Sequence, residues 1–284
     1  MSKIAIVTDS TAYIPSDLVQ KHNLTVTPQV LIWGGETFQD GVDIQPDEFY
    51  ARLKTAKVMP TTSQVSPATM KSTFEGLIEK GYDVLGIFVS AKLSGTIQSA
   101  IQAVDMIGNA GKKVTIVDSN TTAMAMGFQV LTVARAVENG AGLDDAVALA
   151  ERAREHTGVY FAVDTLEFLH RGGRIGGAQR FLGTALNMKP VLAVIDGRVE
   201  AVERIRTKGK ALERVLELVM EQTNGKTPIH LATLHASAEA EARTLLDKAS
   251  KELNAIESIL TTVSPVVGTH AGPGTVGLAY MAGL

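Results

Sequence analysis

The sequence alternates short apolar runs with longer stretches that carry apolar residues at helical spacing, and it does so throughout its first half. Apolar runs that predict buried strands lie at 3–8, 84–89 and 114–117. Stretches that predict helices lie at 15–21, 47–54, 67–80, 96–106, 122–138 and 143–156. Buried strands that alternate with helices form a largely parallel sheet covered by helices. This part is therefore predicted to be an α/β domain.

Shorter signals complete the pattern. A β-branched run at 24–33 predicts one more strand, and 37–42 is expected to return beside it as a hairpin. After about residue 157 the pattern changes, because Asp196-Gly197 separates two apolar runs as a favoured hairpin turn. Further strands are predicted at 159–163, 191–195, 199–205, 229–234 and 259–267, and helices at 212–220 and 238–251. This second half is predicted to hold a mixed sheet with helices.

The length of 284 residues favours two domains, which we place at 1–157 and 158–284.

The chain has no cysteine, which rules out disulfides, thiolate metal sites and a cysteine nucleophile. Aromatic residues make up 5% and the net charge is −3, so no nucleic-acid partner is expected. No metal-binding signature is present. Because the apolar runs are strand-sized, we expect a cytoplasmic protein with no integral membrane segment.

A cluster of hydroxyl side chains precedes the helix predicted at 67–80. The segment 60–67 holds four of them, Thr62 and Ser63 included, and no charged residue. Ser66 before Pro67 is explained as a helix N-cap. Hydroxyls beside the unpaired N–H groups of a helix N-terminus also form a seat for a carboxylate or a phosphate. A plain cap and an anion site both remain open.

A second polar loop follows the strand at 84–89 and contains Ser94 and Gly95. Open α/β sheets bind their ligands at the carboxyl ends of strands, where this loop lies. The nucleophile elbow of a serine hydrolase needs glycine two residues before and two after the serine, where this chain has Lys92 and Thr96. Anion binding is therefore the better functional interpretation, and an ordinary loop is the alternative.

Two glycine-rich segments follow in the second half. The first, at 168–177, holds four glycines with Arg171 and Arg174, and Arg206 lies further along the chain. It is single and flanked by apolar runs, so it predicts a tight turn that presents arginines to an anionic ligand or an acidic partner. Solvated surface charges are an equally open interpretation.

The second glycine-rich segment, at 268–277, contains G-x-G-x-x-G, but no βαβ unit follows it, which argues strongly against a dinucleotide site. What remains is His270 beside a Gly-Pro-Gly turn at a strand end, with a short helix expected afterwards. A lone histidine is more often structural than catalytic, although its place at this turn favours a function. Asp9 and Asp118 end two of the predicted strands, and they either line the same crevice as Ser94 or cap helices.

Taken in order, these segments resemble the DegV family, bacterial fatty acid-binding proteins that are the lipid-carrying subunits of fatty acid kinase. The resemblance covers the whole chain. It rests on Thr-Asp-Ser-Thr at 8–11, Pro-Thr-Thr-Ser-Gln at 60–64, Leu-Ser-Gly-Thr at 93–96, Phe-Leu-His-Arg-Gly-Gly-Arg-Ile at 168–175, Arg-Thr at 206–207 with Lys-Ala-Leu at 210–212, and His-Ala-Gly-Pro-Gly at 270–274. Val65 departs from the family pattern, which often has proline there, and this affects stiffness but no polar contact.

The resemblance implies two α/β domains with a long-chain fatty acid, such as palmitate, stearate or oleate, buried between them and no further cofactor. It implies that Thr62 and Ser94 hold the carboxylate, that His270 hydrogen-bonds to Thr62, and that Ser63 and Gly95 complete the seat. The candidates for the tunnel lining are Met124, Met126, Phe128 and Leu186.

The resemblance also implies a partner. Arg171, Arg174 and Arg206 would lie near the mouth of the tunnel, where an ATP-binding kinase subunit that resembles dihydroxyacetone kinases docks. The carrier itself would not be an enzyme, and the partner would convert the carboxylate to an acyl phosphate for phospholipid synthesis. Two alternatives are a serine-type lipid or ester hydrolase that uses Ser94 and His270, and a nucleic-acid regulator that uses the arginine loop, which the net charge disfavours.

Overall fold

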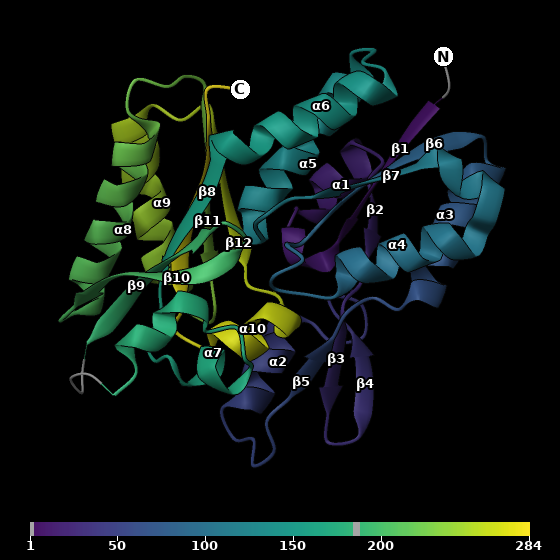
Figure 1. The fold of residues 1–284 in the computed structure, drawn as a ribbon. Helices are drawn as coiled ribbons and strands as arrows, with labels where there is room; N and C mark the ends of the chain where they lie inside the picture. The colour runs from purple at the N-terminus through teal and green to yellow at the C-terminus, as the bar shows by residue number, and fades with distance from the viewer. Residues whose placement is uncertain (1–2, 184–187) are drawn as a thin grey trace.

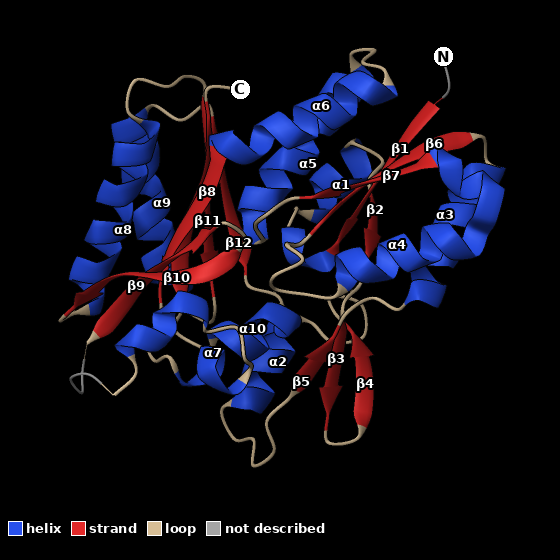
Figure 2. Cartoon of the chain, viewed as in Figure 1, coloured by secondary structure: helices blue, strands red, loops and turns tan. Residues whose placement is uncertain are grey.

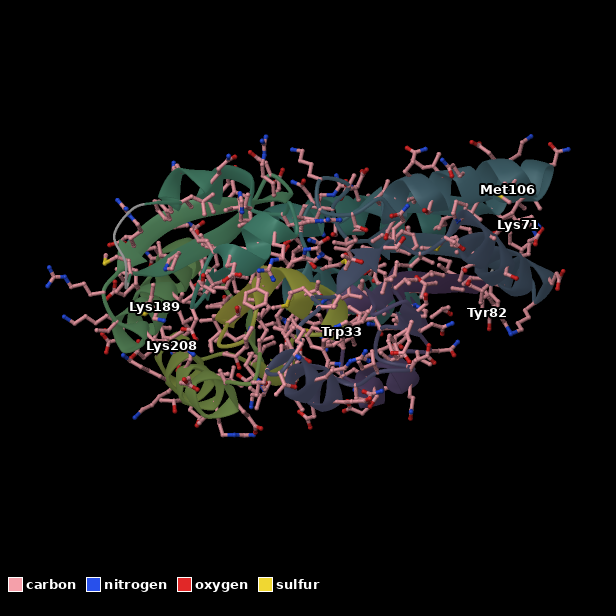
Figure 3. All side chains as sticks on the ribbon, turned by 90° about the horizontal axis from the view of Figure 1, so that it is seen from below. Trp33, Lys71, Tyr82, Met106, Lys189 and Lys208 are labelled. Atoms are coloured by element: carbon pink, nitrogen blue, oxygen red, sulfur yellow. The ribbon has the colours of Figure 1, made fainter. Side chains whose placement is uncertain are left out.

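The computed structural model describes residues 3–183 and 188–284, which form three β-sheets with helices packed around them (Figure 1). Figure 2 shows the small sheet standing apart, below the two larger ones. Seen from below in Figure 3, Lys189 and Lys208 lie at one end of the molecule and Tyr82 and Met106 at the other, with Trp33 between them. In this view the small sheet, which carries Trp33, therefore lies between the two ends of the molecule.

One large sheet is parallel throughout, with the strand order β2-β1-β6-β7. Its strands are β1 (Lys3–Asp9), β2 (Thr25–Thr27), β6 (Tyr82–Phe88) and β7 (Val114–Asp118). The helices around it are α1 (Ser16–Lys21), α3 (Pro67–Glu79), α4 (Thr96–Ile107), α5 (Ala123–Glu138) and α6 (Leu143–Ala153). Alternate residues of β6 face opposite layers, so Val84 and Phe88 join the core under α3 and α4, while Leu85 and Ile87 join the core under α5. The predicted parallel α/β arrangement is confirmed.

The other large sheet is mixed, with the strand order β10-β9-β8-β13-β11-β12 and one parallel pair, β11 with β12, among its described strands. Its strands are β8 (Thr157–Ala162), β9 (Lys189–Ile195), β10 (Arg198–Ile205), β11 (Ile229–His235), β12 (Glu257–Thr262) and β13 (Val276–Ala282). Helices α8 (Lys208–Thr223) and α9 (Glu239–Leu253) cover one face, and α5 packs against the other. The prediction of a mixed sheet with helices is also confirmed.

The predicted strand at 24–33 is wrong as one unit. It is divided between β2 in the parallel sheet and β3 (Val30–Trp33) in the small sheet. The break falls at Pro28, which has no N–H to donate to a strand ladder. The small sheet has the antiparallel order β4-β3-β5, with β4 (Glu36–Gln39) as the expected hairpin partner and β5 (Thr61–Ser63) as an unexpected strand. Helix α2 (Pro46–Leu53) connects β4 with β5.

The C-terminal region differs most from expectation. The strand predicted at 259–267 ends at Thr262, and α10 (Pro265–Ala271) begins three residues later with Ser264 as its N-cap. His270 therefore lies on a helix. The short helix expected after the Gly-Pro-Gly turn is instead β13, in which every residue is buried between β8 and β11. A fully buried run has no polar face, so periodicity alone does not separate a strand from a helix there.

Helix α5 is shared by the two large sheets. Its residues from Ala123 to Val133 are buried, Thr132 excepted. They pack in one core with Leu85 and Ile87 of the parallel sheet and with Val159 and Met281 of the mixed sheet. Within 3–183 and 188–284, the larger elements are joined by the 3-10 turns η1 (Ser10–Ala12), η2 (Gly108–Lys113), η3 (Arg154–His156) and η4 (Gly176–Phe181).

Candidate ligand-binding site

An apolar cavity lies where the carboxyl edge of the parallel sheet faces the mixed sheet, beside α10 and the small sheet. The space between atoms there is about 870 Å³, with the open solvent at its mouth included. Its apolar lining comes from both halves of the chain: Val89, Leu93, Ala123, Val159, Phe161, Leu169, Val194, Val199, Leu234, Val263, Val266, Val267 and Ala271. Such a wall suits a long apolar ligand.

The expected tunnel lining is wrong for three residues. Met124, Met126 and Phe128 are buried in the core that α5 shares with both sheets, and they do not line the cavity. Leu186 lies outside the described residues. The N-terminal end of α5 reaches the cavity through Ala123 instead, because that end of the helix faces the carboxyl edge of the parallel sheet.

Four of the five predicted ligand-binding residues line this one cavity: Thr62, Ser63, Ser94 and His270. They come from β5, from the loop after β6 and from α10. The small sheet brings the first two into place, because Thr62 pairs with Leu31 of β3 and β3 packs against α10. Residues separated by more than two hundred positions thus meet at one wall.

Thr62 and His270 are in direct contact, with 2.8 Å between Thr62 Oγ1 and His270 Nε2. Burial, and after it the positive charge of Arg174, together lower the pKa of His270 to about 4. The imidazole is therefore neutral near pH 7 and carries one ring hydrogen.

The surroundings of the ring indicate which nitrogen carries that hydrogen. Within the described residues, Nδ1 of His270 has no hydrogen-bond partner. A hydrogen on Nδ1 would be a buried donor without an acceptor, so we assign it to Nε2, which donates to Thr62 Oγ1. The hydroxyl hydrogen of Thr62 is then free to donate into the cavity.

The loop with Arg171 and Arg174 holds the other side of the His270 ring. A Cβ added at Gly172 would lie 2.0 Å from His270 Nδ1, so only glycine lets the loop pack this closely. Gly172 ends the short helix α7 (Glu167–Arg171), which packs against α10 near the centre of the molecule (Figure 1). The glycine-rich turn predicted from the sequence is therefore part of the wall that positions the histidine.

Ser94 is positioned by a chain of polar side chains. Gln29 Nε2 donates to Thr96 Oγ1 over 2.8 Å, and Thr96 Oγ1 lies 3.0 Å from Ser94 Oγ. Either hydroxyl can donate in the Ser94–Thr96 pair, and we assign the hydrogen between them to Thr96. The Thr96 backbone N–H also donates to Ser94 Oγ, over 3.3 Å. Ser94 accepts both hydrogens, so its own hydroxyl hydrogen is free to donate into the cavity.

Gly95 is not among the described residues that line the cavity. It is the N-cap residue of α4 and has no side chain to cap the helix. The side chain of Gln64 lies against it, since an added Cβ would be 3.1 Å from Gln64 Cδ. Gly95 thus lets the segment that follows Ser63 approach the loop that carries Ser94.

The three predicted docking arginines differ in their surroundings. Arg171 is exposed and pairs with Glu167 over 2.5 Å. Arg174 is half-buried and donates to two backbone carbonyls, those of Leu93 at 3.1 Å and Gly172 at 2.8 Å. Arg206 is exposed beyond the end of β10 and is not among the described residues that line the cavity.

The strand-end aspartates Asp9 and Asp118 organise loops. Asp9 is fully buried and accepts hydrogen bonds from Thr11 and from the backbone N–H of Val89. Burial raises its pKa, and these hydrogen bonds oppose that rise. Asp118 accepts from the backbone N–H groups of residues 91 and 120. Both carboxylates therefore hold the loops at the sheet edge in place.

Sequence reasoning missed Gln29 and Asp40. Asp40 is 2% exposed; it accepts from Ser10 Oγ at 2.6 Å and from the backbone N–H of Val266 at 3.1 Å. It thereby ties the end of β4 to the first turn of α10, the helix that carries His270. No local pattern marks either residue, because their partners lie far away in the sequence.

The arrangement lacks the contacts of a serine hydrolase. His270 bonds to Thr62, Ser94 bonds to Thr96, and in the described part of the chain no carboxylate bonds to His270 Nδ1. Residues 3–183 and 188–284 contain no group of three or more His, Asp or Glu that could hold a metal ion. No helix among them is long and apolar enough to cross a membrane.

Comparisons with known proteins agree on one family. A family model described as "Uncharacterised protein, DegV family" matches residues 3–283. A DegV domain-containing protein of Streptomyces coelicolor is 36% identical over 277 residues, which cover 97% of each chain.

Solved structures agree as well. A DegV family protein from Thermus thermophilus, whose description names fatty acid binding, superposes with a TM-score of 0.93 at 36% identity over 99% of each chain. DegV of Bacillus subtilis, described as a fatty acid binding protein, superposes with a TM-score of 0.90 at 32% identity over 99% of this chain and 100% of its own. The present chain belongs to the DegV family.

Proposed function

We propose that this protein binds a long-chain fatty acid, such as palmitate, stearate or oleate, in the apolar cavity and that Thr62 and Ser94 hold the carboxylate. One observation carries the proposal: the cavity is apolar over most of its wall and is lined by the hydroxyls of Thr62 and Ser94, which the hydrogen assignment above leaves able to donate to a ligand. The similar proteins of T. thermophilus and B. subtilis are described as fatty acid-binding, which supports the same ligand class here.

Two free-energy terms decide whether such a ligand binds: the gain from burying its alkyl chain and the cost of burying its carboxylate. A palmitate chain has about 14 methylenes, and at about 0.8 kcal/mol each their burial contributes about 11 kcal/mol before the costs of binding. The carboxylate needs hydrogen bonds, since a bare buried charge costs several kcal/mol. Thr62 and Ser94 supply two donors, and we propose that Ser63 and the backbone at Gly95 complete the seat.

We further propose that the protein is a carrier without catalysis of its own, which presents the fatty acid to an ATP-binding kinase subunit resembling dihydroxyacetone kinases. A more polar pocket adjoins the cavity, shares Thr62, Arg174 and His270 with it, and has Arg171 in its wall. This pocket supports access from outside to the carboxylate, with Arg171, Arg174 and Arg206 as the docking residues.

In the proposed reaction, a carboxylate oxygen attacks the γ-phosphorus of ATP, the bond to the β-phosphate oxygen breaks, and acyl phosphate and ADP result. The acyl phosphate would then enter phospholipid synthesis, and the need for ATP places the pair in the cytoplasm. We also propose that the chain divides into the domains 1–157 and 158–284, with the ligand held between them.

Ligand binding is tested by native mass spectrometry of the purified protein, followed by titration with palmitate, stearate and oleate. We expect one fatty acid per chain. Thr62→Val and Ser94→Ala should each lower palmitate affinity about 10-fold, since each removes one hydrogen bond to a charged group. Thr61→Val is the matched control, because Thr61 is the exposed neighbour on the same strand. A protein that carries no lipid and binds none of the three acids would contradict the proposal.

Presentation to a kinase is tested with ATP, palmitate-loaded protein and the dihydroxyacetone kinase-like subunit from the same source, with acyl phosphate trapped by hydroxylamine. Arg171→Glu and Arg206→Glu should abolish the hydroxamate product and leave palmitate binding intact. Arg243→Glu on α9 is the control, an exposed arginine paired with Glu239 as Arg171 is with Glu167. Full product formation with both docking variants would refute the docking assignment.

A further inference from the structure

Arg174 is the one charged side chain among the described residues that line the apolar cavity. The other titratable groups in that wall are His270 and Tyr13. His270 is neutral near pH 7, and Tyr13 is neutral as well, because burial raises its pKa well above the usual value of 10. No aspartate or glutamate belongs to the described lining. The wall therefore carries one uncompensated positive charge when the cavity holds no anion.

The surroundings of Arg174 leave that charge without a counter-ion. Its nitrogens donate to the carbonyls of Leu93 and Gly172, which are neutral acceptors. In the described part of the chain no carboxylate lies within ion-pair distance of it, although its neighbour Arg171 pairs with Glu167. Burial lowers the pKa of Arg174, and no nearby acid opposes that change. A half-buried guanidinium in this state favours an anion beside it.

The contacts of Arg174 place it at the hydroxyl wall. Leu93, whose carbonyl it binds, directly precedes Ser94 in the chain. Gly172, whose carbonyl it also binds, packs against the His270 ring that supports Thr62. One guanidinium therefore joins the loop that carries Ser94 to the turn that packs on His270, the hydrogen-bond partner of Thr62.

We propose that Arg174 is the counter-ion of the ligand's carboxylate, and that it makes the cavity selective for an anionic head group over a neutral one of the same chain length. This inference rests on the proposed function and goes beyond it, because it gives Arg174 a role in the isolated protein, before any partner docks. Its carbonyl contacts hold the guanidinium in place, so the charge acts on the carboxylate without replacing the hydroxyl donors.

Other charged groups around this wall are already engaged or point elsewhere. Lys92 donates to the carbonyl of Asp196 over 2.7 Å, and Arg198 lies 3.7 Å from Glu200. Both belong to an outer pocket that shares Arg174 with the cavity but not its hydroxyls. Arg174 is thus the cation that faces the cavity from this side.

The test compares palmitate with hexadecanol, which has the same chain length and a neutral head group. Wild-type protein should bind palmitate at least 10-fold more tightly than hexadecanol. Arg174→Gln should lower palmitate affinity about 10- to 100-fold, as expected for loss of a charged partner, and change hexadecanol affinity less than about 3-fold. Arg174→Lys, which keeps the charge, should restore most of the preference. Arg171→Gln, on the same loop, should leave both affinities unchanged.

A second measurement follows the ligand itself. With carboxyl-¹³C palmitate, the carbon resonance reports ionisation, and the carboxyl pKa of the bound ligand should be higher in Arg174→Gln than in wild-type protein.

An equal loss of affinity for both ligands in Arg174→Gln would overturn the inference, because it would indicate a structural role only. If that variant does not fold, the affinities of the wild-type protein for palmitate and hexadecanol decide. Equal affinity for the two ligands would refute the counter-ion role of Arg174 and leave the proposed function standing. Wild-type protein that binds neither ligand refutes the proposed function and the inference together.

Discussion

Replacing Gly172 by alanine tests how closely the arginine loop holds the His270 ring. Gly172 has φ −77° and ψ −6°, which alanine adopts freely, so the backbone itself does not resist the change. The added Cβ, however, would lie 2.0 Å from Nδ1 and 2.8 Å from Cε1 of His270. The ring or the loop must therefore retreat by about 1.4 Å to reach ordinary contact.

A retreat of the ring would disturb its contact with Thr62. Thr62 lies 2.8 Å from Nε2 on its other side, so a shift of this size distorts or breaks their hydrogen bond. Overpacking of this kind costs about 1–3 kcal/mol of folding free energy, partly offset by about 0.4–1 kcal/mol because alanine restricts the unfolded chain. We expect the Gly172→Ala variant to be about 1–2 kcal/mol less stable. Its palmitate affinity should fall about 10-fold, since Thr62 loses its fixed orientation.

The assay combines urea denaturation, palmitate titration and ¹⁵N NMR of the histidine ring, which reports the ring hydrogen and its hydrogen bond. Gly209→Ala is the matched control, because Gly209 lies in α8 with no heavy atom within 4 Å of an added Cβ. That variant should keep its affinity and gain a few tenths of a kcal/mol, about 0.4–1 at most. A Gly172→Ala protein with wild-type affinity and an unchanged His270 spectrum would refute the packing argument.

Three further outcomes follow from buried groups. The pKa of His270 is 6.5 in the unfolded chain and about 4 in the folded protein, so as the pH falls the unfolded state takes up this proton first. The free energy of unfolding is therefore highest above about pH 6.5 and falls by about 3 kcal/mol at most towards pH 4. In urea denaturation, His270→Gln should remove this contribution to the pH dependence, and an unchanged pH dependence would contradict the assignment. The pKa of Glu257 is lowered from 4.5 to about 2, chiefly by the hydrogen bond from His230, so its stabilisation is present above pH 4.5 and lost between 4.5 and 2; acid unfolding of Glu257→Gln should lack that loss. Gly127→Ala should lower the free energy of unfolding by about 1–3 kcal/mol, because its Cβ would lie 2.7 Å from the carbonyl oxygen of Ala12; an unchanged melting temperature would contradict this.

Periodicity predicted β1, β6 and β7 of the parallel sheet well, because each is a short apolar run that is followed along the chain by a helix. It failed where tertiary burial removed the pattern. β13 is buried along its whole length at the centre of the mixed sheet, so nothing in its sequence marks a strand face. The Ser264-Pro265 pair was a readable N-cap signal for α10, and the apolar run around it hid that signal.

The candidate site also contains some residues that the sequence marks and others that it does not. Thr62, Ser94 and His270 stood out as candidates because they belong to short polar or glycine-rich motifs, although Thr62 lies on a strand and His270 on a helix and not in the expected loops. Gln29 and Asp40 did not, because each stands alone among strand residues and gains its role from partners 67 and 226 positions away. The close packing of Gly172 on His270 also has no local signal, since it depends on how α7 meets α10.

The burial of α5 between both large sheets has a consequence for cooperativity. A helix that completes two cores at once leaves neither sheet able to form its full hydrophobic interface without the other. The halves should therefore melt in one transition, and a fragment that ends at Thr157 would leave exposed the α5 surface that packs against β8 and β13. Since the cavity wall also draws on both halves, a bound ligand would raise the midpoint of that single transition rather than protect one half alone.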